Sequence, residues 1–156
     1  MNTIQFSLTS SKIEDYLTTA IYIDGIDLKE ILAYYEMGQI ENRQLQSLVG
    51  AYEGISAFIA FHLNSHFLKD TIQEYIQSDY GYTLFEYAYS GIPREHNVSC
   101  HINIHQDTVE WINFKNRSIF LKKCFQYQGL HFCFDRKQYE QAIEEVIENE
   151  VKPIYT

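Results

Sequence analysis

Apolar and polar residues alternate on both sides of Gln106 and Asp107 in the segment HINIHQDTVEW, residues 101–111. Successive side chains of a strand point to opposite faces, so a two-residue turn at Gln106 and Asp107 gives an antiparallel hairpin with two distinct faces. The apolar face holds Ile102, Ile104, Val109 and Trp111. The polar face holds His101, Asn103, His105, Thr108 and Glu110. This separation predicts a hairpin with one face on a core.

The hydrophobic period changes from two to 3.6 after Asp135, which indicates a helix. Its buried stripe is predicted to be Tyr139, Ala142, Ile143, Val146 and Ile147. Asp135 is the expected N-cap, and Gln138, three residues later, is the expected reciprocal partner of a capping box. Pro153 is expected to prevent further extension of this helix.

The N-terminal half predicts two short strands over residues 3–8 and 19–23, followed by a helix that Asp27 caps and Gly38 ends. Two more helices are expected over residues 42–52 and from about residue 55 to 69, and then an aromatic-rich strand over residues 81–89. No composition break or repeat appears, so residues 1–156 are expected to form one domain. We predict an α+β fold, with an antiparallel sheet and helices packed mainly on one face.

The formal net charge of −9 argues against nucleic acid as a partner. The densest basic spots, Lys122-Lys123 and Arg136-Lys137, do not form a stripe. A basic protein is the better expectation, because opposite electrostatic fields accelerate encounter.

The sequence also predicts where the protein resides. The start of the chain has no basic segment followed by a long apolar run, and the apolar run ISAFIAF is too short to span a bilayer. The three cysteines, Cys100, Cys124 and Cys133, form no CxxC pair, so nothing requires a disulfide. We expect a cytoplasmic protein with no membrane association.

Two histidine pairs are candidate metal ligands. His101 and His105 lie about 13 Å apart along one strand, which is too far for two ligands of one zinc ion. His62 and His66 have the i, i+4 spacing of a helical pair, but the stretch HLNSH lacks the glutamate of a zincin. We expect no cofactor and no catalytic residue. A metal-dependent enzyme that uses His62, His66 and a third ligand, and a small-molecule-binding domain, remain alternatives.

The polar hairpin face and the acidic face of the C-terminal helix are the candidate binding surfaces. The residues expected to contact a partner are His101, Asn103, His105, Glu110, Glu140, Glu144 and Glu148. Glu140, Glu144 and Glu148 repeat every four residues, and a basic partner would relieve their repulsion. Two alternatives are that these surfaces are only solvated, and that His105 and Glu110 form a catalytic pair. The leading hypothesis is a non-enzymatic protein-binding module.

Two blocks of the chain resemble a loosely defined family of small, uncharacterised bacterial cytoplasmic proteins. The blocks are IYIDGIDLKEILAYYE, residues 21–36, and VEWINFKNR with FQYQGLHFCFDRKQYEQAIEEV, residues 109–117 and 125–146. The family pattern is a strand, an Asp-Gly turn and a helix near the start, then a Trp-containing strand and a Phe-Asp-Arg helix start. The general profile is similar to that of immunity proteins, which implies inhibition of a bacterial toxin or other basic protein.

Overall fold

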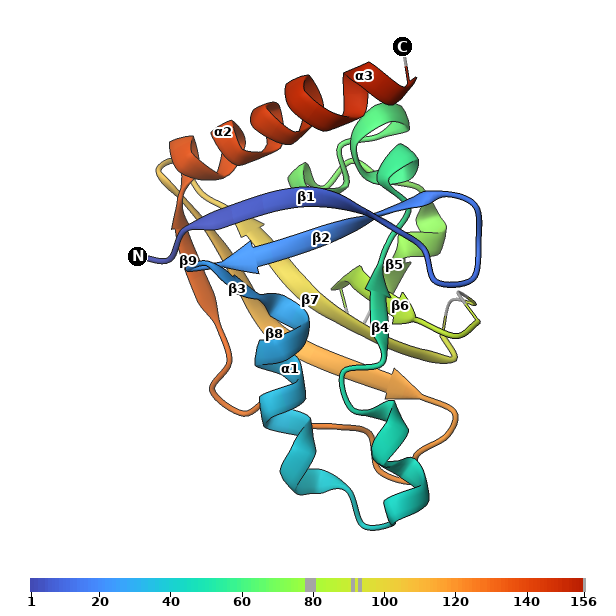
Figure 1. Ribbon diagram of the computed structural model, residues 1–156. Helices are drawn as coiled ribbons and strands as arrows, with labels where there is room; N and C mark the ends of the chain where they lie inside the picture. Colours follow the sequence, from blue (N-terminus) through green and yellow to red (C-terminus); the bar gives the residue numbers. More distant parts are fainter. Residues whose placement is uncertain (78–80, 91, 93, 156) are drawn as a thin grey trace.

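The computed structural model describes residues 1–77, 81–90, 92 and 94–155. Two antiparallel sheets and two main helices pack together into one body, so the predicted α+β class is confirmed (Figure 1). The smaller sheet has the order β1-β2-β3, with bounds Ile4–Ser10, Leu17–Ile23 and Ile26–Asp27. The predicted N-terminal strands are therefore confirmed, and Asp24 and Gly25 form the turn between β2 and β3.

The larger sheet is curled and has the order β4-β6-β7-β8-β9, with the short β5 beside β6. Its bounds are β4 Tyr52–Gly54, β5 Ile76–Gln77, β6 Gly81–Tyr87, β7 His96–Ile104, β8 Thr108–Ser118 and β9 Phe132–Asp135. The register shifts once in β6, between Thr83 and Phe85, and once in β7, between Ser99 and His101. Such irregularities bend strands, which is consistent with the curl.

Helix α1 spans Leu28–Glu36, and helix α2 spans Arg136–Val146. Figure 1 shows α2 lying along β1, with the chain continuing through a π-helical turn, Ile147–Val151, into the short helix α3, Lys152–Tyr155. In the described part of the chain, none of the helices has the length and apolar character needed to traverse a bilayer.

The predicted hairpin register is confirmed by the pairing of β7 with β8. Ile104 pairs with Val109 and Ile102 with Trp111, as the alternation required. The His105 amide donates to the Thr108 carbonyl at 2.8 Å, which closes the turn over Gln106 and Asp107. The Trp111 indole is fully buried beneath α2, as expected for the apolar face.

The predicted stripe of α2 is confirmed for Tyr139, Ala142, Ile143 and Val146, which are buried, while Ile147 is half-buried. Asp135 caps the helix by accepting from the Gln138 amide at 3.0 Å. The proposed reciprocal role of Gln138 was wrong. Its side-chain oxygen accepts from the Ile4 amide at 3.1 Å, and its nitrogen donates to the Ile4 carbonyl at 2.7 Å, so it binds β1 instead.

The expected effect of Pro153 was also wrong. Pro153 is the second residue of α3, so the chain remains helical through it. A proline is tolerated in the first turn of a helix, because its missing amide would have no partner there.

The two helices predicted over residues 42–52 and 55–69 were wrong. Residues Arg43–Leu48 form only a 3-10 turn, and Tyr52–Gly54 form β4. Residues Phe58–Leu63 form a π-helical turn and His66–Leu68 a further 3-10 turn. The apolar spacing resembled a helix, but β4 is held by pairing with β6 in a distant part of the chain.

Candidate functional site

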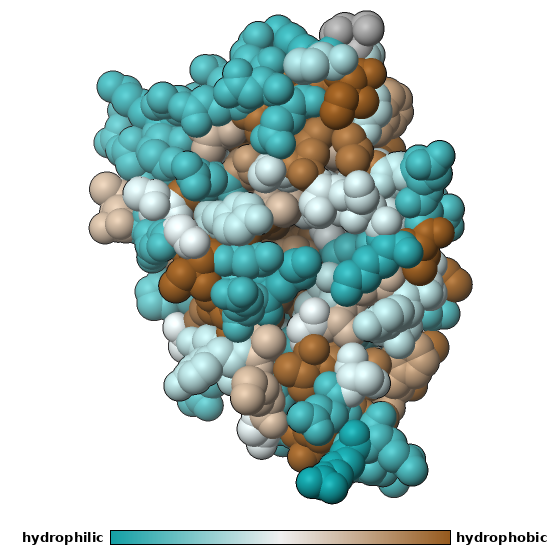
Figure 2. Space-filling view, in the orientation of Figure 1, coloured by the Kyte–Doolittle hydropathy of each residue, from teal (hydrophilic) through white to brown (hydrophobic). Residues whose placement is uncertain are grey.

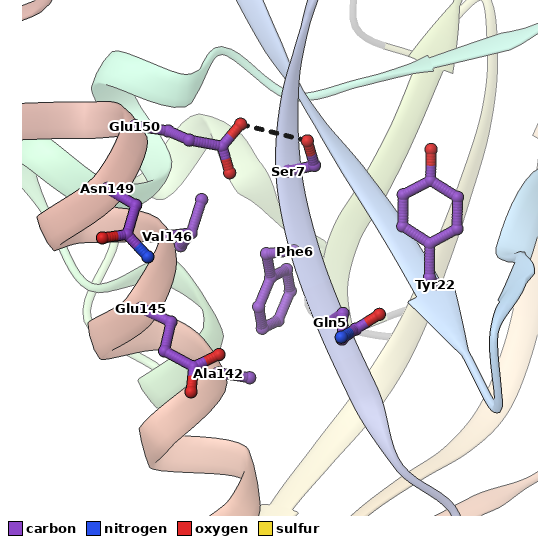
Figure 3. A pocket seen from close by; sticks show the side chains of 9 residues that line it. All are labelled: Gln5, Phe6, Ser7, Tyr22, Ala142, Glu145, Val146, Asn149 and Glu150. Atoms are coloured by element: carbon purple, nitrogen blue, oxygen red, sulfur yellow. Dashed lines mark hydrogen bonds between the residues drawn. The ribbon is translucent and has the colours of Figure 1, made fainter.

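A groove of about 250 Å³ lies between β1 and α2. Its floor is formed by the buried apolar side chains of Phe6, Ala142 and Val146. Its remaining lining is polar or amphipathic and consists of Gln5, Ser7, Tyr22, Glu145, Asn149 and Glu150. Figure 3 shows Phe6 between the strand and the helix, with Glu150 reaching from the helical side toward Ser7.

The carboxylates of the groove are held by neighbouring groups. One Glu150 oxygen accepts from the Ser7 hydroxyl at 3.1 Å and from the Leu8 amide at 3.2 Å. One Glu145 oxygen accepts from the Gln141 side chain at 3.0 Å. The two carboxylates are held in place above an apolar floor. This arrangement can accommodate a side chain with an extended apolar stem and a positively charged end.

The three glutamates predicted on α2 and the turn after it lie on its outer surface. Figure 2 shows a hydrophilic surface over α2. Glu140 is paired with Arg136 at 2.7 Å, and Glu148 is paired with Lys152. Glu144 is exposed and lies between them in the sequence. The row of three glutamates is therefore not purely repulsive, because two of them have a basic neighbour.

The polar hairpin residues share the outer face of β7 and β8. His105 and Glu110 are in contact, with 2.6 Å between the His105 Nε2 and a Glu110 oxygen. Asn113 contacts the His101 Nδ1 at 3.0 Å, and Asn103 is half-buried opposite Glu110.

Arg136 connects the two predicted surfaces. It donates to the His105 carbonyl at 2.9 Å and to Glu140 at 2.7 Å. The hairpin tip and the first turn of α2 therefore form one continuous polar surface, which borders a hollow of about 460 Å³.

The His62 and His66 side chains have different surroundings. His66 is fully buried, and its Nε2 bonds the Thr83 carbonyl at 2.7 Å. Burial lowers the pKa of His66 to about 4. His62 is exposed and stacks on the Tyr155 ring at 5.5 Å. In the parts of the chain that are described, no three His, Cys, Asp or Glu side chains are placed to hold a metal ion.

A buried carboxylate network that was not predicted surrounds Glu36. One Glu36 oxygen accepts from both the Tyr52 and Tyr127 hydroxyls, and the other accepts from the Gly50 amide at 2.8 Å. Asn116 donates to the Tyr52 oxygen at 3.3 Å. Burial raises the pKa of Glu36, although all three hydrogen bonds act in the opposite direction. The signal was present, because Glu36 continues the buried stripe of Leu28 and Leu32 at four-residue intervals.

A pair of carboxylates on the curled sheet was also not predicted. Glu53 of β4 and Glu86 of β6 lie directly opposite each other, and both are buried. The Ser11 hydroxyl and the Lys12 amide donate to Glu53 at 2.8 Å and 3.0 Å. Burial, and next the charges of Glu53 and Glu74, raise the pKa of Glu86 to about 7. No local sequence pattern signals this pair, because it depends on which strand β4 joins.

The site geometry therefore provides two kinds of acidic feature, an open groove beside α2 and an enclosed pair on the curled sheet. Comparison of this chain with protein-family models, with curated proteins and with solved structures finds no match.

Proposed function

We propose that this chain is a non-enzymatic binding protein of the immunity-protein type. It would neutralise a basic protein, such as a bacterial toxin, by receiving one of its cationic side chains in the groove between β1 and α2. The observation that carries the proposal is the combination of an apolar floor with the Glu145 and Glu150 carboxylates. A lysine or arginine side chain has the matching chemistry, because its apolar stem can be buried while its charged end stays paired.

Preorganisation supports the same function. The bonds from Ser7 and Leu8 hold the Glu150 carboxylate in place, so less side-chain freedom is lost when a partner binds. The net charge of −9 attracts a basic protein over longer distances and increases its association rate. The polar surface that Arg136 connects, including His105, Glu110 and Glu140, would form the rim of the interface.

The test is capture of a partner from native lysate, followed by titration of the purified pair. A double variant, Glu145→Gln with Glu150→Gln, removes the charge of the groove but keeps acceptor oxygens for Gln141, Ser7 and Leu8. The matched control is Glu30→Gln with Glu41→Gln, which changes the net charge equally at two exposed positions outside the groove.

We expect one basic partner at a stoichiometric ratio, released as the salt concentration rises. The groove variant should weaken its binding at least about tenfold, and the control should slow association only slightly. Glu144→Gln and His105→Ala should have smaller effects, as expected for the rim of an interface. The proposal would be refuted by a partner that binds the groove variant as tightly as the wild-type protein. It would also be refuted if no partner were captured, whether the salt concentration is low or raised.

A further inference from the structure

Four polar atoms without hydrogen bonds are gathered on β6 and β7. They are the Glu86 Oε1, both side-chain atoms of the Asn97 amide, and the Ser99 Oγ. These residues are only 4%, 1% and 0% exposed, and the described part of the chain offers none of the four atoms a partner. An unpaired buried polar group is costly, so a native protein rarely keeps several together without a bound species.

The strand register places these residues on one face of the sheet. Phe85 pairs with Val98, so one position further along each strand Glu86 is next to Asn97. Ser99 is two residues from Asn97 and shares its face. The shift between Thr83 and Phe85 lies on β6, opposite Val98 and Ser99, and the shift in the β7–β8 pairing begins after Ser99, so Asn97 and Ser99 keep the regular alternation of β7. Glu53 lies on the other side of Glu86, so the carboxylate pair and the Asn97 amide form one row across three strands.

The carboxylates of Glu53 and Glu86 make the β4 and β6 end of the row negative, whereas β8 places Arg117 directly beside Asn97 and Lys115 beside Ser99 at the other end. After burial, the carboxylates of Glu53 and Glu74 are the groups that raise the pKa of Glu86. The segments over the row contribute Tyr16 and Tyr75, and the pKa of each tyrosine is raised, first by burial and then by nearby carboxylates that include Glu86. Glu53 accepts bonds from the Ser11 hydroxyl and the Lys12 backbone amide, and both of these donor groups are uncharged.

We propose that Glu53, Glu86, Asn97 and Ser99 form a binding site for a hard divalent cation. The four side chains offer carboxylate, amide and hydroxyl oxygens, which are the ligands of Ca²⁺, Mg²⁺ and Mn²⁺. The Asn97 amide is free to turn its oxygen inward, because neither of its atoms is engaged among the described residues. Water molecules complete the coordination shell, as is usual for these ions.

The burial of the row determines the size and type of ligand. Because all four members are at most 4% exposed, a small ion fits where a side chain of a partner protein does not. The set contains no imidazole or thiolate, which disfavours zinc and copper. This cation site is on the curled sheet, and the proposal does not depend on partner binding at the groove between β1 and α2.

The experiment uses the full chain, first stripped with a chelator. Thermal unfolding is followed with Ca²⁺, Mg²⁺ or Mn²⁺ added separately, and Tb³⁺ luminescence excited through tyrosine is recorded, with Tyr16 and Tyr75 as the nearby donors. At a hundredfold excess over Kd, the midpoint of unfolding should rise by roughly 5 °C or more with at least one of the ions. Addition of that ion should also displace Tb³⁺ and quench its luminescence.

The variants are Glu86→Gln and Asn97→Leu, and the control is Glu36→Gln, at a buried carboxylate outside the row. Each variant is compared with its own chelated form, so a change in basal stability does not obscure the result. The ion-dependent rise should be lost in both row variants and kept in the control. If none of the three ions raises the midpoint and Tb³⁺ does not bind, the row holds water only and the proposal is wrong. An undiminished response in Glu86→Gln would also overturn it, because the ion would then bind elsewhere.

Discussion

Glu36 and Tyr52 are joined by a 2.7 Å hydrogen bond inside the core, although they are 16 positions apart in the chain. The Tyr127 hydroxyl donates to the same carboxylate oxygen. Helix α1, strand β4 and the segment after β8 thus meet at one ionisable group. Burial raises the pKa of both tyrosines well above the usual range, so the hydroxyls remain protonated donors.

Removal of one of these hydrogen-bond donors should lower the stability of the fold. Tyr127→Phe is expected to lower the free energy of unfolding by about 1.5–3 kcal/mol, because a buried carboxylate loses a charge-assisted hydrogen bond. Tyr35→Phe is the control, since the Tyr35 ring packs against Tyr127 but its hydroxyl has no hydrogen-bond partner in the described ranges. Urea denaturation measures both. Equal losses in the two variants would show that the Glu36 network contributes little.

Gly54 occupies a position where no side chain fits. A Cβ atom there would lie 1.8 Å from the Thr19 carbonyl oxygen, because β4 runs close to the backbone of β2. Gly54→Ala should therefore destabilise the fold by several kcal/mol or prevent folding, since two backbones would have to separate. Gly38→Ala, where nothing lies within 4 Å of the new atom, should leave stability unchanged or raise it by about 0.4–1 kcal/mol. Soluble yield and thermal midpoints test this contrast, and an unperturbed Gly54→Ala variant would contradict it.

His66 should make stability depend on pH below neutrality. Its pKa falls from 6.5 in the unfolded chain to about 4 in the folded protein, so between these values only the unfolded chain binds the proton. The free energy of unfolding should consequently decrease as the pH falls from 6.5 to 4, by on the order of 3 kcal/mol.

The contribution of His66 is isolated with a substitution. His66→Gln keeps a donor for the Thr83 carbonyl and removes the titrating ring. Its unfolding free energy should be less sensitive to pH over this window than that of the wild-type protein. His131→Gln, at an exposed position, should retain the wild-type slope. Parallel slopes for wild type and His66→Gln would exclude His66 as the source.

Gln138 should contribute more to the free energy of unfolding than an ordinary helix residue does. Its amide makes both hydrogen bonds with the backbone of Ile4, so Gln138→Leu leaves two backbone groups of β1 without partners. A loss of about 1–3 kcal/mol is expected in guanidinium denaturation. Gln141→Leu is the control, because among the described residues that exposed side chain bonds only Glu145. The role assigned to Gln138 fails if the two losses are the same.

Local patterns predicted the parts of the fold that local physics determines. The alternation around Gln106 and Asp107 predicted the pairing of β7 with β8, because a one-residue shift would turn the apolar set toward solvent. The 3.6-residue period and the Asp135 cap predicted α2 for the same kind of reason. The contact between His105 and Glu110 also followed from the register, since they are diagonal neighbours in a hairpin.

The segment between α1 and β6 was not predictable in this way. Its leucines and aromatic residues have helical spacing, yet Tyr52–Gly54 pair with β6 and exclude a helix there. The Glu53–Glu86 pair is a consequence of that pairing, so it was equally hidden. The groove beside α2 was missed because Phe6 and Glu150 belong to elements that only the folded chain brings together.

The attachment of β1 to the chain 134 and 142 residues further on has a consequence for biosynthesis. A nascent chain emerges from the ribosome in order, so β1 and β2 can pair long before Gln138 and Glu150 have been made. Throughout that interval the outer edge of β1 would lack its partners, and an unprotected strand edge is a template for pairing with other chains. Nascent chains on neighbouring ribosomes are therefore a setting in which this protein is exposed to self-association, and a chaperone that shields β1 would act before α2 has been made.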